Sequence, residues 1–122
     1  TAQGLLAADG IDARPHPLAM AALEVTEGAR RISAAAAYRD GLVELQDAAS
    51  QAVVEMLPLA DGMRVLDLCA GGGGKTLAMA ARAKLRLWAH DSEPRRMTDL
   101  PARAARAGGA VTVTGNPENT AP

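Results

Sequence analysis

Four consecutive glycines, Gly71–Gly74, follow an apolar run that contains the acidic residue Asp67. Leucine and alanine residues after the glycines have a spacing suited to a helix. The pattern predicts a strand, a tight loop and a helix N-terminus. Glycine lacks a Cβ atom, so the main chain can approach a ligand closely. The unpaired N–H groups of a first helical turn can donate hydrogen bonds to the polar end of such a ligand. A nucleotide-like ligand is therefore the first hypothesis.

Two other interpretations of the glycines are a flexible linker and a phosphate-binding P-loop. A linker seldom stands between a buried strand and an immediate helix. Gly74-Lys75-Thr76 fits the end of the P-loop pattern G-x-x-x-x-G-K-[ST]. The first glycine of that pattern falls on position 69, which is Cys69. The P-loop thus fits in part and stays open as an alternative.

A domain that binds S-adenosylmethionine or a dinucleotide fits better. In such domains an acidic residue at the end of the next strand holds the ribose hydroxyls. Residues 85–90 have the composition of that strand, and Asp91 follows them about 20 residues after Gly71, the usual spacing. The dinucleotide pattern needs a small residue where this chain has Thr76. The S-adenosylmethionine interpretation therefore fits best.

Composition limits the class of protein. Of the 122 residues 48% are hydrophobic, with no Phe, one Trp and one Tyr, so the chain can bury only a thin core. A lone cysteine excludes an internal disulfide and suits the reducing cytoplasm, where we expect the protein to be. No apolar run approaches the roughly 20 residues needed to span a membrane. No His/Cys cluster has metal-ligand spacing, so we expect no metal.

Charge is distributed unevenly along the chain. Residues 1–60 hold four basic and eight acidic side chains, whereas residues 61–122 hold nine and six. A solvated helical surface explains the basic second part most simply. Contact with nucleic acid is the alternative, although no stacking aromatic residues are interleaved with the basic ones.

The pattern of elements predicts an α/β fold. We expect a helix over 2–9, strands over 11–14 and 42–45, a helix from an Asp47 cap through 57, a strand over 63–68, a helix to 83, a strand over 85–90, a helix from Ser92 that Pro101 kinks or splits, a strand over 110–114 and a loop over 115–122. From residue 47 onward this order gives β-α-β-α-β with a parallel sheet. A complete domain of this kind needs about twice as many strands, so we expect a fragment with an exposed sheet edge and self-association through a bare face.

Three motifs in order resemble the Nol1/Nop2/Sun (Fmu) family of RNA 5-methylcytosine methyltransferases. They are the segment Gln46–Gln51, the loop Cys69–Thr76, set on the family pattern C-A-A-P-G-G-K-T, and Asp91. The match covers residues 38–114. It implies a partial Rossmann-like class I methyltransferase domain over 38–122, preceded over 1–37 by the end of a small RNA-binding-like domain.

The resemblance also implies the roles of individual residues. Asp91 accepts the ribose hydroxyls, and Asn116 stands near the adenine, where the family often has an acidic residue. The family's Ala-Pro is Gly71-Gly72 here, which loosens the loop. The loop residues surround S-adenosylmethionine mainly through backbone N–H groups; they are Cys69, Ala70, Gly71, Gly72, Gly73, Gly74 and Lys75.

The resemblance implies that the full-length protein binds RNA, either rRNA or tRNA. Family members attack cytosine with a cysteine from motifs that would begin beyond Pro122, so we assign no catalytic residue and expect the fragment to be inactive alone. We expect Cys69 to be a small, semi-buried residue instead. Two rival hypotheses remain: a nucleotide-binding P-loop fragment, and a binding module without catalysis.

Overall fold

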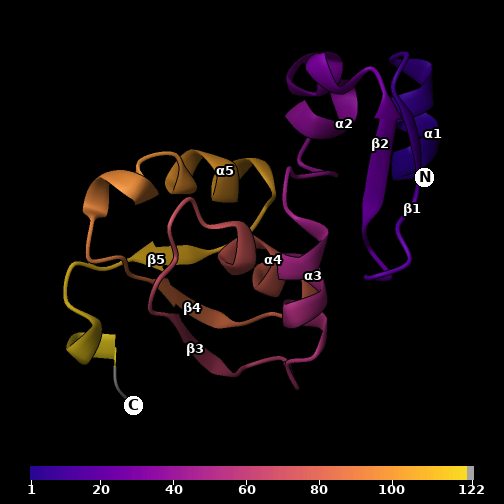
Figure 1. The fold of residues 1–122 in the computed structure, drawn as a ribbon. Helices are drawn as coiled ribbons and strands as arrows, with labels where there is room; N and C mark the ends of the chain where they lie inside the picture. The colour runs from indigo at the N-terminus through magenta and orange to yellow at the C-terminus, as the bar shows by residue number, and fades with distance from the viewer. Residues whose placement is uncertain (121–122) are drawn as a thin grey trace. The chain divides into compact units, whose positions relative to one another are not determined.

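A computed structural model describes residues 1–120, which form two compact units, one over Thr1–Glu55 and one that begins at Met56 (Figure 1). Both units mix helices and strands. The compact division falls after residue 55. The assignment of residues 1–37 and 38–122 to two functional domains stays a prediction. No helix of the described residues is long and apolar enough to cross a membrane.

The first unit is built on an antiparallel hairpin. Strand β1 (Asp12–Pro15) pairs with β2 (Leu23–Glu27), from Asp12 opposite Glu27 to Pro15 opposite Leu23. Around it lie helix α1 (Ala2–Ala8), the 3-10 helix η1 (Ala29–Ala34), α2 (Ala36–Arg39) and α3 (Ala48–Glu55). The core of this unit consists of Leu6, Ile11, Ile32, Ala35 and Ala37.

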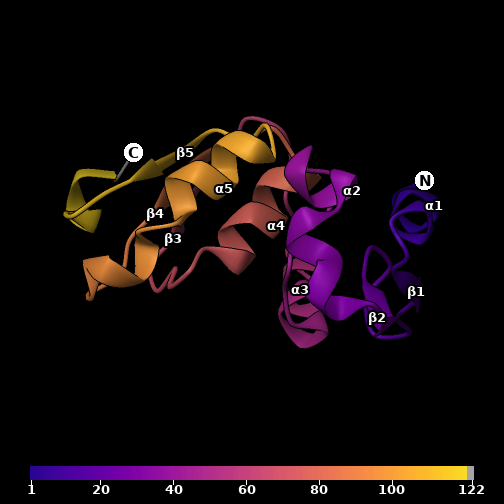
Figure 2. The same ribbon diagram turned by 90° about the horizontal axis from the view of Figure 1, so that it is seen from above.

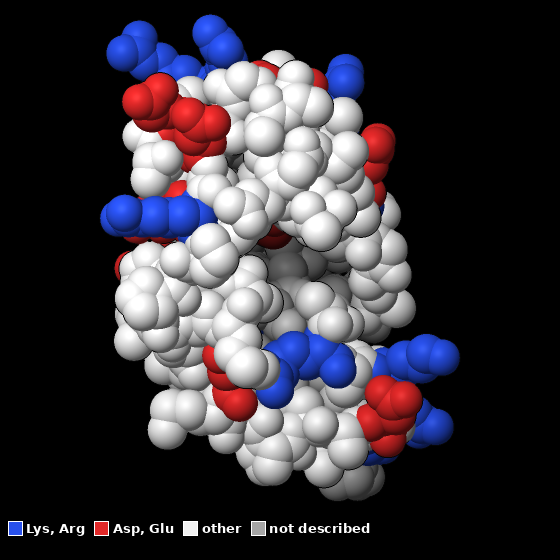
Figure 3. All heavy atoms as spheres, turned by 90° about the vertical axis from the view of Figure 1, so that its right-hand side faces the viewer, with Lys and Arg blue, Asp and Glu red and all other residues white. Residues whose placement is uncertain are grey.

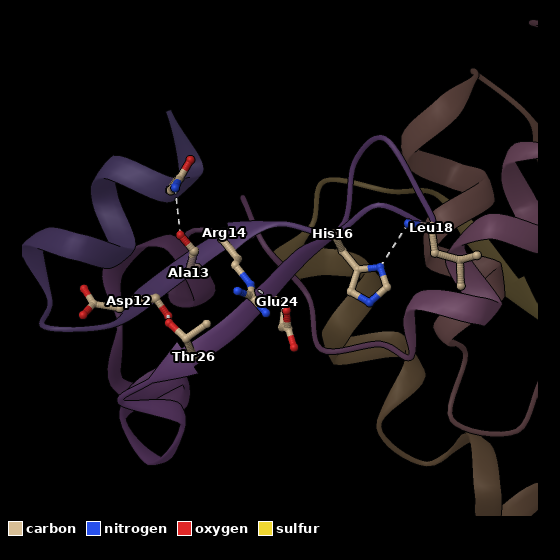
Figure 4. A network of polar contacts seen from close by, with 8 residues as sticks. Asp12, Ala13, Arg14, His16, Leu18, Glu24 and Thr26 are labelled. Atoms are coloured by element: carbon tan, nitrogen blue, oxygen red, sulfur yellow. Dashed lines mark hydrogen bonds and ion pairs between the residues drawn. The ribbon is translucent and has the colours of Figure 1, made fainter.

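Short-range polar contacts hold the hairpin (Figure 4). Arg14 Nε donates to Glu24 Oε2 at 2.8 Å, and Thr26 Oγ1 donates to the Asp12 carbonyl at 3.2 Å. The Leu18 N–H donates to His16 Nδ1 at 3.1 Å. The His16 side chain thus stabilises its own turn. Both side chains of the Arg14–Glu24 pair are largely exposed, so this ion pair contributes at most about 1 kcal/mol to the free energy of unfolding.

Helix α3 begins where the sequence predicts. The Ala49 N–H donates to Asp47 Oδ1 at 2.7 Å, which confirms Asp47 as the cap. At the other end the Glu55 carboxylate accepts the N–H groups of Met20 and Ala21, at 3.1 and 3.2 Å. The helix is thus tied to the loop of the hairpin within the same unit.

The strand predicted over 42–45 is wrong. Val43 packs against the core, while Leu42 and Leu45 are exposed. The N–H groups of Leu42 and Val43 donate to the Ala37 carbonyl, so they close the end of α2 rather than join a sheet.

The second unit is a parallel sheet in the order β3-β4-β5. Strand β3 (Arg64–Asp67) pairs with β4 (Arg86–Ala89), and β4 pairs with β5 (Val111–Val113). Helix α4 (Gly74–Arg82) connects the first two strands; the 3-10 helix η2 (Pro94–Met97) and α5 (Leu100–Arg106) connect the next two. The predicted order of three parallel strands with intervening helices is confirmed.

Proline and the end of the chain modify two predicted elements. The helix predicted from Ser92 is split into η2 and α5, and Pro101 stands in the first turn of α5, where its missing N–H costs nothing. The loop predicted over 115–122 contains a further 3-10 helix, η3 (Pro117–Thr120). Residues 121–122 of that prediction lie outside the described residues.

The two faces of the parallel sheet differ. Helices α4 and α5 lie on the same side of the strands (Figure 2). Their side of the sheet holds the core, formed by Ala70, Leu77, Ala89, Met97, Leu100 and Ala104. On the other face Leu66, Trp88 and Thr112 stand in register, and the Arg64 guanidinium lies 5.2 Å from the centre of the Trp88 ring. Leu66 is 36% exposed there. The sheet thus has one packed face and one open face within the described part of this unit.

Basic side chains do not merge into one patch on the face drawn in Figure 3. Blue side chains there stand apart, with white surface between them and red side chains beside several of them.

Candidate functional site

The glycine loop is a tight turn between β3 and α4. Gly71 and Gly73 have φ values of 54° and 86°, in the left-handed region that favours glycine. The Gly73 N–H donates to the Ala70 carbonyl at 2.8 Å, and the Ala70 N–H donates to the His90 carbonyl at 2.9 Å. The loop is therefore fixed both within itself and to the end of β4.

Gly73 also packs closely against α5. A Cβ atom placed on Gly73 would lie 2.3 Å from Leu100 Cδ1, and Leu100 is fully buried. No side chain fits between the loop and the helix at this point. Glycine is thus required at position 73 for its conformation and for its size.

Asp91 and the glycine loop are in direct contact, as the sequence predicts for two parts of one site. The Gly71 N–H donates to Asp91 Oδ2 at 2.8 Å, and the Glu93 N–H donates to Oδ1 at 2.9 Å. Asp91 is 3% exposed, and Arg96 Nη1 lies 3.5 Å from Oδ2. The Glu93 N–H, the Gly71 N–H and the Arg96 charge together hold the pKa of the Asp91 carboxyl below its usual value, although burial acts against them.

This arrangement gives Asp91 a structural task. Each carboxylate oxygen already accepts one backbone N–H, and an ionised carboxylate offers about four acceptor positions. The carboxylate therefore shapes the loop, and its role toward a ligand stays a prediction.

The contact between Asp67 and Thr76 is part of the site that the sequence analysis missed. Thr76 Oγ1 donates to Asp67 Oδ2 at 2.6 Å, and Thr76 is fully buried. The contact joins the end of β3 to the first turn of α4 across the glycine loop. An acidic residue at a strand end and a threonine in the next helix are the signal that could have indicated it.

Replacing Thr76 by valine should lower the free energy of unfolding by about 1–2 kcal/mol. Valine keeps the shape of the side chain but cannot donate to the Asp67 carboxylate. Urea denaturation of the whole chain measures the loss. The matched control is Thr112→Val, because Thr112 is exposed on the open face of the sheet. Equal stability of the two variants would contradict a structural role for the Thr76 hydroxyl.

Two arginines that sequence reasoning treated as surface charge lie against the loop. Arg96, on η2, contacts Asp91, and a Cβ atom on Gly71 would lie 3.2 Å from its Nη2. Arg103, on α5, donates from Nη1 to the Gly72 carbonyl. No local pattern indicates that either arginine reaches the loop, because Gly71 and Arg96 are 25 positions apart and Gly72 and Arg103 are 31 apart.

The remaining predicted residues take varied positions. Ala70 is buried, Lys75 is exposed in the first turn of α4, and Gly74 is the first residue of that helix. Asn116 follows β5, and its Oδ1 accepts the Glu118 N–H at 3.1 Å. Because the carboxyl ends of parallel strands meet at one edge, the loop, Asp91 and Asn116 follow strands at the same edge of the sheet. Their roles toward a ligand stay predictions.

The expectation for Cys69 is wrong. Cys69 is exposed rather than semi-buried. It lies between the end of β3 and Ala70, which is buried and donates to the His90 carbonyl. Among the described residues, no three His, Cys, Asp or Glu side chains lie together as a metal site would require.

Comparison with known proteins gives consistent results. No family model matches the chain. It is 33% identical over 117 residues to the ribosomal RNA small subunit methyltransferase B of Xanthomonas campestris pv. campestris, covering 95% of this chain and 26% of that protein. The protein of the same name from Serratia proteamaculans is 35% identical over 94 residues, 72% of this chain and 20% of the relative.

A solved structure has the same fold. The crystal structure of PH0851 matches with a TM-score of 0.79 and 26% identity, over 93% of this chain and 26% of that one. The chain thus spans about a quarter of the length of the relatives that it matches.

Proposed function

Because this chain belongs to the Nol1/Nop2/Sun (Fmu) family, whose relatives here are named ribosomal RNA small subunit methyltransferase B, we propose that it is the cofactor-binding part of an RNA cytosine-C5 methyltransferase. The observation that carries the proposal is the contact between the Gly71 N–H and the Asp91 carboxylate. It brings the glycine loop and the acidic strand end together, as a nucleoside-binding site requires.

The ligand of this site is S-adenosylmethionine in our proposal. Backbone N–H groups of residues 69–75 would receive its amino-acid end, and the free acceptor positions of Asp91 would receive its ribose hydroxyls. Asn116 would lie near the adenine. The cofactor supplies an activated methyl group, and the residues of this chain bind and orient it.

RNA, and ribosomal RNA in particular, is the proposed substrate of the whole protein. We assign the attack on cytosine to residues outside this stretch and none of it to Cys69, so the stretch alone would bind cofactor without methylating RNA. The cytoplasm is the proposed location. The open face with Leu66 and Trp88 is the surface through which this stretch alone would self-associate.

The P-loop alternative meets a structural objection. In a P-loop the hydroxyl that follows the lysine binds Mg²⁺. Here that hydroxyl belongs to Thr76, which is fully buried and donates to Asp67. The lone pairs of this oxygen could still bind a metal, but the residue is fully buried, so a magnesium nucleotide would have to displace the atoms that cover it.

Calorimetry with two ligands tests the proposal. S-adenosylhomocysteine should bind the chain at least about tenfold more tightly than ATP with magnesium, because Asp91 offers acceptors to a ribose and the loop offers no free hydroxyl to a metal. Tighter binding of ATP would favour the P-loop. If the chain binds neither ligand, a scaffold module that binds no cofactor would explain this part of the protein better.

A further inference from the structure

The glycine loop has little rigidity of its own. Four glycines in succession lose more conformational entropy on folding than any other tetrapeptide. A loop that must present ordered N–H groups to a ligand therefore needs restraints from elsewhere, since disorder in the free state weakens binding.

Three of the four glycines are restrained by Asp91, by the loop itself or by helix α4. The Gly71 N–H is held by Asp91, the Gly73 N–H by the Ala70 carbonyl, and Gly74 is part of α4. Gly72 is exposed and stands at the tip of the turn. Its carbonyl accepts a hydrogen bond from Arg103 Nη1, a charged donor from a helix about 30 residues further along the chain.

The restraint from Arg103 is of a strong type. A hydrogen bond from a guanidinium is about twice as strong as one between neutral groups. Arg103 is half-buried on α5, the helix whose Leu100 packs against Gly73. Helix α5 thus contacts the loop at two successive residues, once by packing at Gly73 and once by a charged donor at Gly72.

We propose that Arg103 is a positioning residue: its guanidinium fixes the Gly72 carbonyl and so holds the loop in the conformation that binds the cofactor. The effect on ligand affinity rests on the proposed function, whereas the effect on the loop itself does not. Arg103 acts through the backbone of the loop and not by touching the ligand.

Proline at position 72 offers an independent way to restrain the same residue. Gly72 has no φ in the left-handed region, and its N–H makes no hydrogen bond among the described residues. The nearest neighbour of a Cβ atom at this position is Arg103 Nη1, at 3.5 Å. Proline at position 72 therefore removes no hydrogen bond of the loop, and it would restrict the loop by removing conformational freedom from the unfolded chain.

The experiment compares amide hydrogen exchange in the loop of the whole chain. Arg103→Met keeps the apolar stem of the side chain and removes the donors. We expect it to raise the exchange rate of the Gly71 and Gly73 amides about tenfold. The double variant Arg103→Met with Gly72→Pro should return these rates close to those of the unchanged chain. Arg82→Ala, at the other end of α4, removes a charge without touching the loop and serves as the matched control.

Affinity for S-adenosylhomocysteine is measured on the same four proteins and should follow the exchange rates, falling with Arg103→Met and recovering with Gly72→Pro. Unchanged exchange in Arg103→Met would overturn the proposal. Affinity that stays low in the double variant while exchange recovers would also overturn it, because Arg103 would then contact the ligand directly. If the unchanged chain binds no S-adenosylhomocysteine, the proposed function fails, and exchange alone still decides the role of Arg103.

Discussion

Replacing Gly73 by alanine is expected to lower the free energy of unfolding by about 2–5 kcal/mol. The residue has a φ of 86°, which costs a non-glycine residue about 1–2 kcal/mol. The new methyl group would also lie 2.3 Å from Leu100 Cδ1 in the core, and such overpacking costs about 1–3 kcal/mol. Urea denaturation of the whole chain measures the sum.

Gly62→Ala separates the two causes. Gly62 has a similar φ of 84° and lies in the same unit, but nothing is found within 4 Å of its Cβ position. It should lose about 1–2 kcal/mol, the cost of the conformation alone. Equal losses in the two variants would mean that Leu100 does not restrict the loop.

Replacing Asp91 by alanine should weaken the binding of S-adenosylhomocysteine about tenfold to a hundredfold. The change removes the acceptor of the Gly71 N–H, so the loop loses its tie to β4, and it removes the acceptor proposed for the ribose. Calorimetry measures the affinity. Glu93→Ala is the matched control, because it removes the same charge two residues away while keeping the backbone N–H that donates to Asp91. Comparable affinity in the two variants would refute a special role for Asp91.

Acid should distinguish the stability of the unchanged chain from that of Asp91→Ala. The pKa of the Asp91 carboxyl is lowered in the folded state, chiefly by the Glu93 and Gly71 N–H groups. The ionised group therefore adds stability at pH values above about 3.9, its usual pKa. This contribution disappears as the pH falls through the lower pKa of the folded state. Unfolding measured between pH 6 and pH 3 should thus show a steeper acid loss for the unchanged chain than for Asp91→Ala. Parallel curves would contradict the assignment.

The strands and helices of the second unit could be predicted because each has a strong local signal. Glycine marks the turns, and apolar runs mark the strands to within two residues at each end. The sequence analysis does not predict β2, although Leu23, Glu24, Val25 and Thr26 alternate between apolar and polar residues. This signal spans only four residues, and pairing with β1 is what completes the strand.

The candidate site also has a part that local sequence predicts and a part that it does not. The proximity of the loop and Asp91 follows from the rule that parallel strands end at one edge, and local sequence suffices for it. The contact from Arg103 depends on where α5 packs, which no local pattern contains, whereas the Asp67–Thr76 contact has a local signal that was overlooked. The exposure of Cys69 likewise depends on how the chain leaves β3, and a preference for buried cysteine predicts it wrongly.

The order β3-β4-β5 has a consequence for the timing of folding. Each strand pairs with the one that follows it in the chain, and paired residues stand only roughly 20 to 25 positions apart, so loop closure costs less than it would between strands further apart in the chain. During synthesis β4 can pair with β3 before β5 has been made. The glycine loop and Asp91 both follow strands of this first pair, so this edge of the sheet can form before α5. Helix α5, with Leu100 and Arg103, comes later in the chain and completes the restraints on the loop.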